Sequence, residues 1–423
     1  MSASPESPAP PALSQPLILL LSLACGIAVA NIYFPQAISP LIADDLGVTS
    51  ASAAVVVTCA QLGYAAGIFL LVPLGDRLRH RSLVTTLLLL TCAGLVLAGT
   101  ASSLTVLALA SALIGLTTVV PQILIPMTVG LTAPERRGAV TGTLLSGLIG
   151  GILLARTFSG TLGEWLGWRA PYLVAAALAL ILALAMAAAL PRTTPSTDQP
   201  YPALLAASVH LLRAEPLLRR SCQYQVLVFA AFSAAWTALA LFVTGPHYGL
   251  GTPAVGLIAL VGAASMFATP IAGRRTDRNG PDAVNLVCMT GAVAAGALLL
   301  TGSLGGAAGL VGLGAGMLLL DVAMQSSQVA NQARIFALRP EARARLNTAY
   351  MTCAFLGGSA GSWLGVRAYS TLGWTGVCAL VAILAGLAVL RHAVRSRPIT
   401  TTAPVAATGT SASEGKDGVP VGR

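Results

Sequence analysis

Long apolar runs recur through most of the chain, and they constrain its fold more than any other feature. Each run is close to twenty residues, and a helix of that length spans the hydrocarbon core of a bilayer, which is ~30 Å thick. We count twelve such runs, so the sequence predicts twelve transmembrane helices. Their approximate ranges are 16–39, 52–73, 83–101, 104–128, 139–161, 170–190, 222–244, 253–273, 283–303, 305–330, 346–367 and 371–391.

The amino-acid composition places these runs in a membrane. The 423-residue chain is 56% hydrophobic and only 9% charged, whereas soluble domains are roughly 25% charged. The runs are continuous and lack the ~10-residue segments of alternating polarity that are typical of transmembrane barrels. Because backbone polar groups in lipid must be satisfied within the protein, the runs are expected to be helices. The sequence therefore predicts an all-α membrane protein.

The positions of the basic residues indicate the orientation of the chain. When both termini are placed in the cytoplasm, most arginines fall in cytoplasmic segments, and only Arg169 and Arg367 fall on the opposite side, in agreement with the positive-inside rule. This topology explains the net charge of +10 without nucleic acid, which we do not expect as a partner. The 23 arginines and single lysine are typical of a GC-rich bacterial genome. We expect a multi-pass protein of the bacterial plasma (inner) membrane with cytoplasmic N- and C-termini.

The two halves of the chain share four landmarks at two similar spacings, and an offset of 201 residues aligns LGDRL (74–78) with RTDRN (275–279). An offset of 206 residues aligns TAPERR with LRPEAR, Gln122 with Gln328, and Gly167-Trp168 with Gly373-Trp374. Landmarks repeated in the same order indicate a duplicated six-helix unit. The predicted organisation is a disordered N-terminal tail (1–15), a six-helix bundle (16–190), a cytoplasmic linker (191–220), a second six-helix bundle (221–392) and a disordered C-terminal tail (393–423). Residues 204–220 of the linker could form either an amphipathic helix on the membrane surface or a solvated connector.

This plan resembles the major facilitator superfamily of secondary transporters over nearly the whole chain. The most specific signal is a loop between the second and third helix of each half, which in that family reads approximately Gly-x-x-x-Asp-Arg-x-Gly-Arg-Arg. The two copies here are VPLGDRLRHR and GRRTDRNG. Residues 33–50 and 57–67 also resemble the first two helices of bacterial drug and sugar efflux members. The resemblance implies two pseudo-symmetric six-helix bundles and a central cavity lined by the first, fourth, seventh and tenth helices.

The two loop copies are expected to form a cytoplasmic gate. A carboxylate at the end of a helix is poorly placed against the helix dipole, so it is expected to pair with an arginine or with the N-terminus of another helix. The resemblance implies that the first copy helps to hold the two halves together. Alternatively, the arginines only enforce the topology. The residues of this gating loop are Asp76, Arg77, Arg81, Gly273, Asp277 and Arg278.

Asp321 and Arg156 are the acid and the base that lie well inside predicted spans. Each costs on the order of 2.5–3.5 kcal/mol at a bilayer centre, so neither is expected to face lipid. Asp321 is predicted to bind the coupling proton, because burial disfavours the charged form of a carboxylate; the alternative is a fixed structural hydrogen bond. Arg156 either recognises an anionic substrate or is structural. Counting ~1.5 Å per residue places the two at depths ~8 Å apart, too far for direct contact unless the helices tilt or a substrate bridges them.

Polar residues inside the spans predict where a substrate binds. Asp321, Gln325, Gln328 and Gln332 follow one another at helical spacing and form one stripe, which is expected to face inward. Trp236 could contribute cavity wall or only packing. The residues expected to line the substrate cavity are Asn31, Gln36, Gln61, Tyr64, Gln122, Arg156, Trp236, Gln325 and Gln328.

No catalytic motif is found in the sequence. The four histidines form no HExxH motif, the seven cysteines have no metal-ligand spacing, and no phosphate-binding loop is present. We therefore expect no enzyme activity, no metal and no cofactor. The sequence predicts a monomeric, proton-coupled transporter that contacts membrane lipid and exports small organic molecules by alternating access. The alternatives are an uptake symporter or facilitator, and a membrane sensor that binds without transporting.

Overall fold

The fold is described from a computed structural model, which places residues 13–133, 136–191, 193–195, 197–339 and 342–395. Most of the two predicted terminal tails, 1–15 and 393–423, lies outside the described residues. The described part of the chain is helical, and it contains no strand.

The described residues of the first half include nine α-helices and the 3₁₀ helix η1. They are α1 (Gln15–Ala30), α2 (Phe34–Leu46), α3 (Ser50–Ala53), α4 (Val55–Leu70), η1 (Val72–Asp76), α5 (His80–Gly99), α6 (Leu104–Thr117), α7 (Val120–Gly130), α8 (Arg137–Leu166) and α9 (Arg169–Ala189). After the helix α10 (Tyr201–Ala214), the second half comprises α11 (Pro216–Thr244), α12 (Thr252–Gly262), α13 (Ser265–Leu299), η3 (Leu300–Leu304), α14 (Gly306–Leu338) and α15 (Arg343–Arg395).

Ten helical segments within the described residues are long and apolar enough to cross a membrane, and two of these segments reverse direction internally. Segments Thr252–Leu304 and Arg343–Val394 have 53 and 52 residues. Gly280 in the first and Gly373 in the second have positive φ angles of 79° and 64°. Glycine adopts this conformation without a steric penalty, so each of the two segments turns there and contributes two crossings. The arrangement is consistent with the twelve predicted helices.

Several crossings are interrupted inside the bundle. The first is divided between α1 and α2, the fourth between α6 and α7, and the eighth between α12 and α13. Prolines stand in the first turns of α2 and α7, where the absence of an N–H is tolerated. Thr118, between α6 and α7, bonds to residues beside the break between α1 and α2. Its hydroxyl donates to the carbonyl of Ala28 at 2.5 Å and accepts from Asn31 Nδ2 at 3.4 Å. The interruptions thus bring polar groups of two crossings together in the interior.

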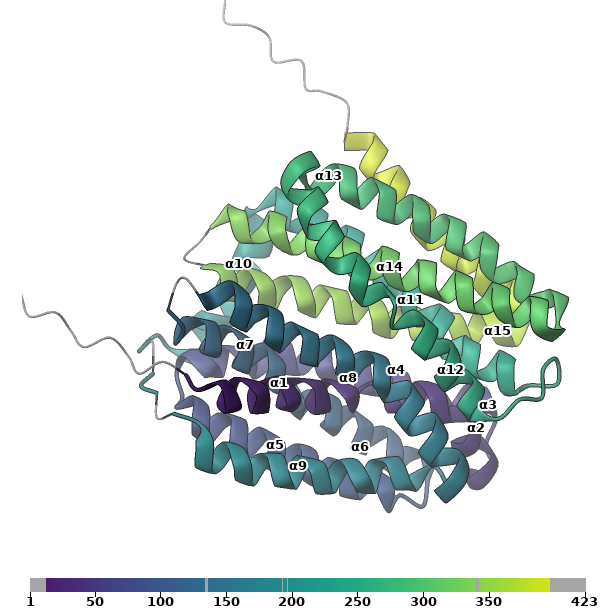
Figure 1. The fold of residues 1–423 in the computed structure, drawn as a ribbon, viewed down its shortest axis with the longest axis horizontal. Coiled ribbons are helices and arrows are strands. Elements are labelled where there is room, and N and C mark those ends of the chain that lie inside the picture. The colour runs from purple at the N-terminus through teal and green to yellow at the C-terminus, as the bar shows by residue number, and fades with distance from the viewer. Residues whose placement is uncertain (1–12, 134–135, 192, 196, 340–341, 396–423) are drawn as a thin grey trace, which may run out of the picture.

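The two halves lie side by side. Figure 1 shows helices α1 to α9 in the lower part of the view and the green to yellow helices of the second half above them. The most extensive contacts between the halves join α4 to α15 and α8 to α12. Whether the halves are independent bundles bounded at 190 and 221 stays a prediction.

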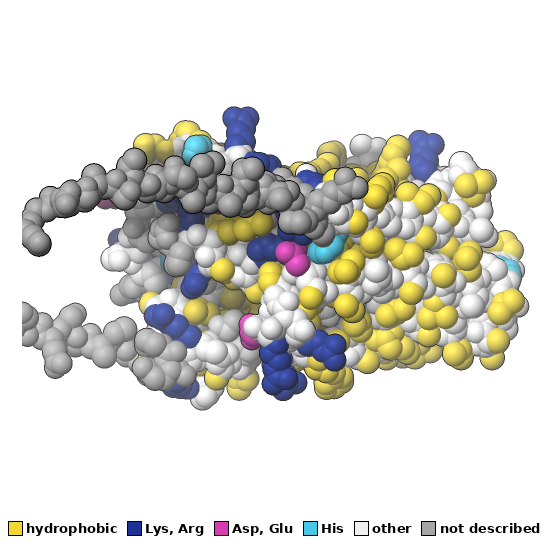
Figure 2. Space-filling model, turned by 90° about the horizontal axis from the view of Figure 1, so that it is seen from above, with side chains coloured by type: hydrophobic (Ala, Val, Ile, Leu, Met, Phe, Trp, Pro, Cys, Tyr) yellow, Lys and Arg dark blue, Asp and Glu magenta, His cyan; other side chains and the backbone are white. Residues whose placement is uncertain are grey.

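The two ends of the bundle differ. We call the end that carries α10, the start of α5 and the end of α14 the linker end, and the opposite end, with the α8–α9 turn, the far end. Figure 2 shows most of the dark-blue Lys and Arg side chains gathered toward one end, while hydrophobic side chains cover the remainder of that face. Such a band of exposed apolar side chains is what a bilayer would cover.

Candidate functional site

A cavity of about 980 Å³ lies between the two halves at the linker end. Its volume is at the upper end of the range of small-molecule pockets. Both halves contribute to its wall: Asp76 and Gln122 come from the first half, and Gln328, Gln332 and Asn347 from the second. The cavity is therefore an inter-half space with amide groups on both sides.

Two of the predicted cavity residues, Gln122 and Gln328, line this space. Asn347 Nδ2 donates to Gln122 Oε1 at 3.3 Å, and Gln122 Nε2 donates to the Tyr64 hydroxyl at 3.4 Å. Gln122 therefore joins the second half to the buried interior of the first. The amides that the sequence repeat aligned do face one cavity.

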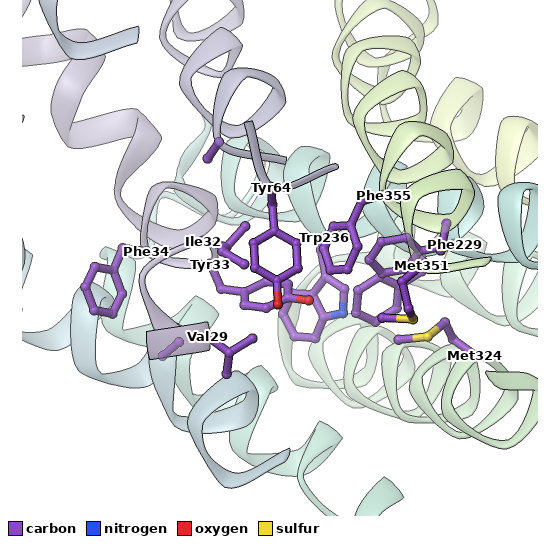
Figure 3. Close-up of a cluster of buried hydrophobic side chains, with 14 of the residues drawn as sticks. Val29, Ile32, Tyr33, Phe34, Tyr64, Phe229, Trp236, Met324, Met351 and Phe355 are labelled. Carbon is purple, nitrogen blue, oxygen red and sulfur yellow. The ribbon is translucent and has the colours of Figure 1, made fainter. Parts of the chain in front are cut away.

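The other seven predicted cavity residues do not line this cavity. Asn31, Gln36, Gln61, Tyr64, Arg156 and Trp236 are at most 2% exposed, and Gln325 is partly buried. A layer of rings closes off the interior: Tyr64 lies 4.5 Å from Phe355, which lies 5.0 Å from Phe229, between ring centroids. Figure 3 shows these rings grouped with Trp236, and with Met351, which lines the cavity. Spacing alone predicted which residues face inward but not this closure.

Arg156 on α8 is buried behind that layer, with 1% exposure. Its Nε donates to Gln36 Oε1 at 2.8 Å, and Nη1 donates to the carbonyl of Ile152 at 3.5 Å. The guanidinium carbon lies 4.1 Å from the ring centroid of Trp236 and 4.9 Å from that of Tyr33. Nη2 has no hydrogen-bond partner. The aromatic faces stabilise the cation, while one donor nitrogen stays unused.

Asp321 on α14 is buried at the edge of the Trp236 ring, with 4% exposure. Its Oδ1 accepts from Trp236 Nε1 at 3.0 Å, and Oδ2 has no partner. A Cβ at Gly262 would lie 2.1 Å from Oδ2. Only a glycine at the end of α12 leaves room for the carboxylate. The side chain therefore points into the protein and not to lipid.

Trp236 on α11 contacts both charged groups, which form no ion pair within 4.0 Å among the described residues. This agrees with the expectation from helix rise that the two do not touch. The sequence offered Trp236 only as cavity wall or packing. Its role as hydrogen-bond donor depends on how α8, α11 and α14 pack together, which no spacing within one helix reveals.

The remaining polar residues have other positions. Gln61 Nε2 donates to Ser233 Oγ at 2.9 Å and so links the two halves. The predicted stripe on α14 runs from the buried Asp321 through the partly buried Gln325 to Gln328 and Gln332 in the cavity wall. Gln328 lies seven residues from Asp321, which is ~10 Å along a helix. The buried acid is thus about two helical turns beyond the cavity wall.

At the far end, α8 and α12 are joined by reciprocal hydrogen bonds between the halves. Thr157 Oγ1 donates to the carbonyl of Gly256 at 2.9 Å, and Thr252 Oγ1 donates to that of Gly160 at 2.8 Å. Glu164 Oε2 accepts from the backbone N–H of Thr252 at 3.1 Å. We call Thr157, Gly160, Thr252 and Gly256 the far-end clasp. Close packing here contrasts with the cavity at the linker end.

The predicted gating loops differ from each other in the structure. Asp76 lines the cavity at the end of η1, and its carbonyl accepts from Thr197 N in the linker at 3.2 Å. Arg77 is exposed and Arg81 partly exposed. In the second copy, Gly273 lies within α13, while Asp277 and Arg278 are exposed and take part in no ion pair of the described residues.

Asp282, which the sequence analysis did not single out, makes the ion pairs near the second loop. Its carboxylate pairs with Arg220 Nη2 at 2.9 Å and with Arg334. Asp282 follows the turn at Gly280, at the start of the second part of α13. A carboxylate is favourable at a helix N-terminus, whereas Asp277 precedes the turn. The side chain of Arg334 is only 5% exposed.

We expect Asp282→Asn to lower the melting temperature of the purified protein more than Asp277→Asn does. The first change leaves the buried Arg334 without its partner carboxylate, which is costly; the second removes an exposed, unpaired charge, which costs little. A fluorescence-based thermal melt in detergent measures both. Equal shifts for the two variants would contradict the role assigned to Asp282.

Comparisons with known proteins agree with this architecture. The family model of the Major Facilitator Superfamily matches residues 19–362. A putative uncharacterized transporter of Escherichia coli K12, YgaY, is 38% identical over 88% of this chain and 94% of its own length. A probable transporter of Streptomyces coelicolor is 37% identical over 85% of this chain and 83% of its own. The solved structure of the nucleoside transporter NupG has a TM-score of 0.71 at 14% identity, covering 89% of this chain and 98% of that one.

Proposed function

Because the chain belongs to the major facilitator superfamily and is thus a secondary transporter, we propose that it exports small organic molecules in exchange for protons. The proposal places the protein as a monomer in the bacterial inner membrane, with the linker end and both termini in the cytoplasm. Asp321 binds the proton. The two halves then rock about the buried cluster, so that a cavity opens alternately at the linker end and at the far end.

The observation that carries the proposal is the environment of Asp321. The carboxylate is buried, its Oδ1 accepts from the Trp236 N–H, and the guanidinium of Arg156 lies over the face of the same indole. These helices belong to different halves: α8 to the first, and α11 and α14 to the second. Movement of the halves would change the separation of Arg156 from Asp321. The protonation state of Asp321 is thereby linked to the conformation.

The closed layer above the cluster supports the same mechanism. Tyr64 belongs to the first half and Phe355 to the second. Their contact must break when the halves separate at the linker end, which would connect the cluster to the cavity. Gln122, which bonds to Tyr64 and lines the cavity, lies on that route.

Everted membrane vesicles with an imposed pH gradient test the proposal. We expect some members of a panel of neutral, anionic, cationic and zwitterionic organic molecules to dissipate the gradient in vesicles that contain the protein, but not in vesicles without it. A pH-sensitive dye reports the gradient. Exchange of a compound across proteoliposomes without any pH change would instead show a facilitator, and gradient-driven movement in the same direction as protons would show a symporter. Saturable binding with no exchange would show a sensor.

A further inference from the structure

Several buried polar atoms around Trp236 have no hydrogen-bond partner. They are Gln36 Nε2, Arg156 Nη2 and Asp321 Oδ2. Native proteins satisfy most buried polar atoms, so a group of unpartnered ones calls for a reason. These atoms come from both halves: Arg156 and Asp321 both contact Trp236, and Gln36 is hydrogen-bonded to Arg156. A ligand with matching polar groups would satisfy them.

The unpartnered donors favour an anionic group. Arg156 Nε can only donate, so the Gln36 atom that it contacts at 2.8 Å must be the oxygen. This fixes the orientation of the Gln36 amide, whose nitrogen has no partner, and Nη2 of the same Arg156 also has none. Gln36 Nε2 and the charged Arg156 Nη2 are therefore two donors that are available to one ligand. A carboxylate has two oxygens that can accept from such a pair.

The unpartnered acceptor favours a cationic group. Asp321 Oδ2 lies against the backbone at Gly262, and Oδ1 is already bonded to Trp236. An ammonium group donates three hydrogen bonds and carries the charge that a buried carboxylate needs. The acceptor lies at the edge of the indole, at Nε1, whereas the guanidinium lies over its face. The cationic group of a ligand would thus bind at the edge of the indole ring, and its anionic group would bind near the face.

The charges select among the possible ligands. With Asp321 ionised, Arg156 and Asp321 sum to zero, so a ligand of zero net charge adds no uncompensated charge to the interior. A substrate group that takes the place of the proton at an ionised Asp321 is best matched by a cation, and the group that meets Arg156 by an anion. We infer that the substrate is a small zwitterion that carries a carboxylate and an ammonium group, as an amino acid does, and that the site is made by Arg156, Gln36, Trp236 and Asp321. This inference rests on the proposed proton exchange.

The rings around the cluster suit the remainder of such a molecule. Tyr33, Phe232 and Trp236 all lie within 6 Å of the guanidinium of Arg156. They offer apolar faces for a hydrocarbon side chain beside the two charged ends. A lone anion would leave the ionised Asp321 without a cation, and a lone cation would leave Arg156 without an anion.

Binding of matched compounds to the purified full-length chain near neutral pH tests the inference. One series is leucine, 4-methylpentanoate and 3-methylbutylamine; the other is phenylalanine, 3-phenylpropionate and 2-phenylethylamine. Within at least one series, we expect the zwitterion to bind about tenfold or more tightly than either singly charged analogue, because each analogue loses a charge-assisted hydrogen bond. Isothermal titration calorimetry measures the affinities.

Two substitutions show which residue binds the ammonium group of the ligand and which binds its carboxylate. Asp321→Asn is expected to shift the preference to the carboxylate analogue, and Arg156→Gln to the amine. Asp44→Asn, at an exposed position on α2, should leave the order unchanged. The inference would be overturned if neither zwitterion binds, if in both series an analogue binds as tightly as its zwitterion, or if neither substitution changes the order of affinities. The binding experiment needs no proton gradient. A negative result there would overturn the substrate class but not the proton exchange, which the vesicle experiment tests separately.

Discussion

Asp321→Asn is expected to abolish transport driven by a pH gradient, while exchange of substrate at equal pH persists but requires a higher substrate concentration, because the substrate loses a charged partner. Asparagine retains the shape of the side chain and can still accept from Trp236 Nε1, but it cannot take up or release a proton. The variant should therefore still change conformation with substrate bound, yet it has no means to use the gradient. The measurement compares gradient-driven flux with exchange at equal pH in proteoliposomes, using a compound that dissipates the gradient in the vesicle experiment.

Asp44→Asn is the matched control for this prediction. It removes the same chemical group from an exposed position without an ion pair among the described residues. Coupled flux should stay at the level of the unchanged protein. Gradient-driven flux that survives in Asp321→Asn would mean that another group carries the proton, and the fixed structural hydrogen bond with Trp236 would then be the better account of Asp321.

Gly256→Ala is expected to shift the protein away from the conformation described here by weakening the far-end clasp. A Cβ at this position would lie 2.8 Å from the Cα of Thr157, and backbone atoms cannot move aside unless α8 and α12 separate. Overpacking typically costs about 1–3 kcal/mol. Since the cost applies only while the far end is closed, the ratio of closed to open molecules should fall by about 5- to 150-fold.

Labelling with a membrane-impermeant thiol reagent measures this shift, with a cysteine introduced at Thr161 near the clasp. Its labelling rate should rise in Gly256→Ala and not in Gly150→Ala, which lies on the same helix α8 with nothing within 4 Å of an added Cβ. Unchanged labelling in both variants would contradict the proposal that the far-end clasp holds α8 and α12 together.

The sequence was sufficient for the helical architecture because membrane-spanning segments leave a strong one-dimensional signal. Run length and composition predicted the helices, and the landmark repeat matched Gln122 with Gln328, which do face one cavity. Gly373, another landmark, is a point at which the chain reverses direction. Such features depend on one helix at a time, or on the repeat of one helix in the other half.

The site was predicted less completely because its features depend on several helices at once. Asp321 and Arg156 were identified from the cost of burying charge, but their common contact with Trp236 requires the packing of α8, α11 and α14. The room that Gly262 leaves for the carboxylate depends in the same way on α12. At the second gating loop, the family motif indicated Asp277, whereas the turn at Gly280 places Asp282 between Arg220 and Arg334.

The central claim is that the charge on Asp321 controls the relative position of the two halves. Electron–electron distance measurements on spin-labelled protein test it most directly, with one label pair at the far end (Leu166 and Leu372) and one at the linker end (Leu78 and Ala344), on a background without the native cysteines. All four positions are exposed. Relative to the unsubstituted protein near neutral pH, we predict that Asp321→Asn, which mimics the protonated acid, lengthens the far-end distance and shortens the linker-end distance. Distance distributions that are identical with and without the substitution would contradict the account.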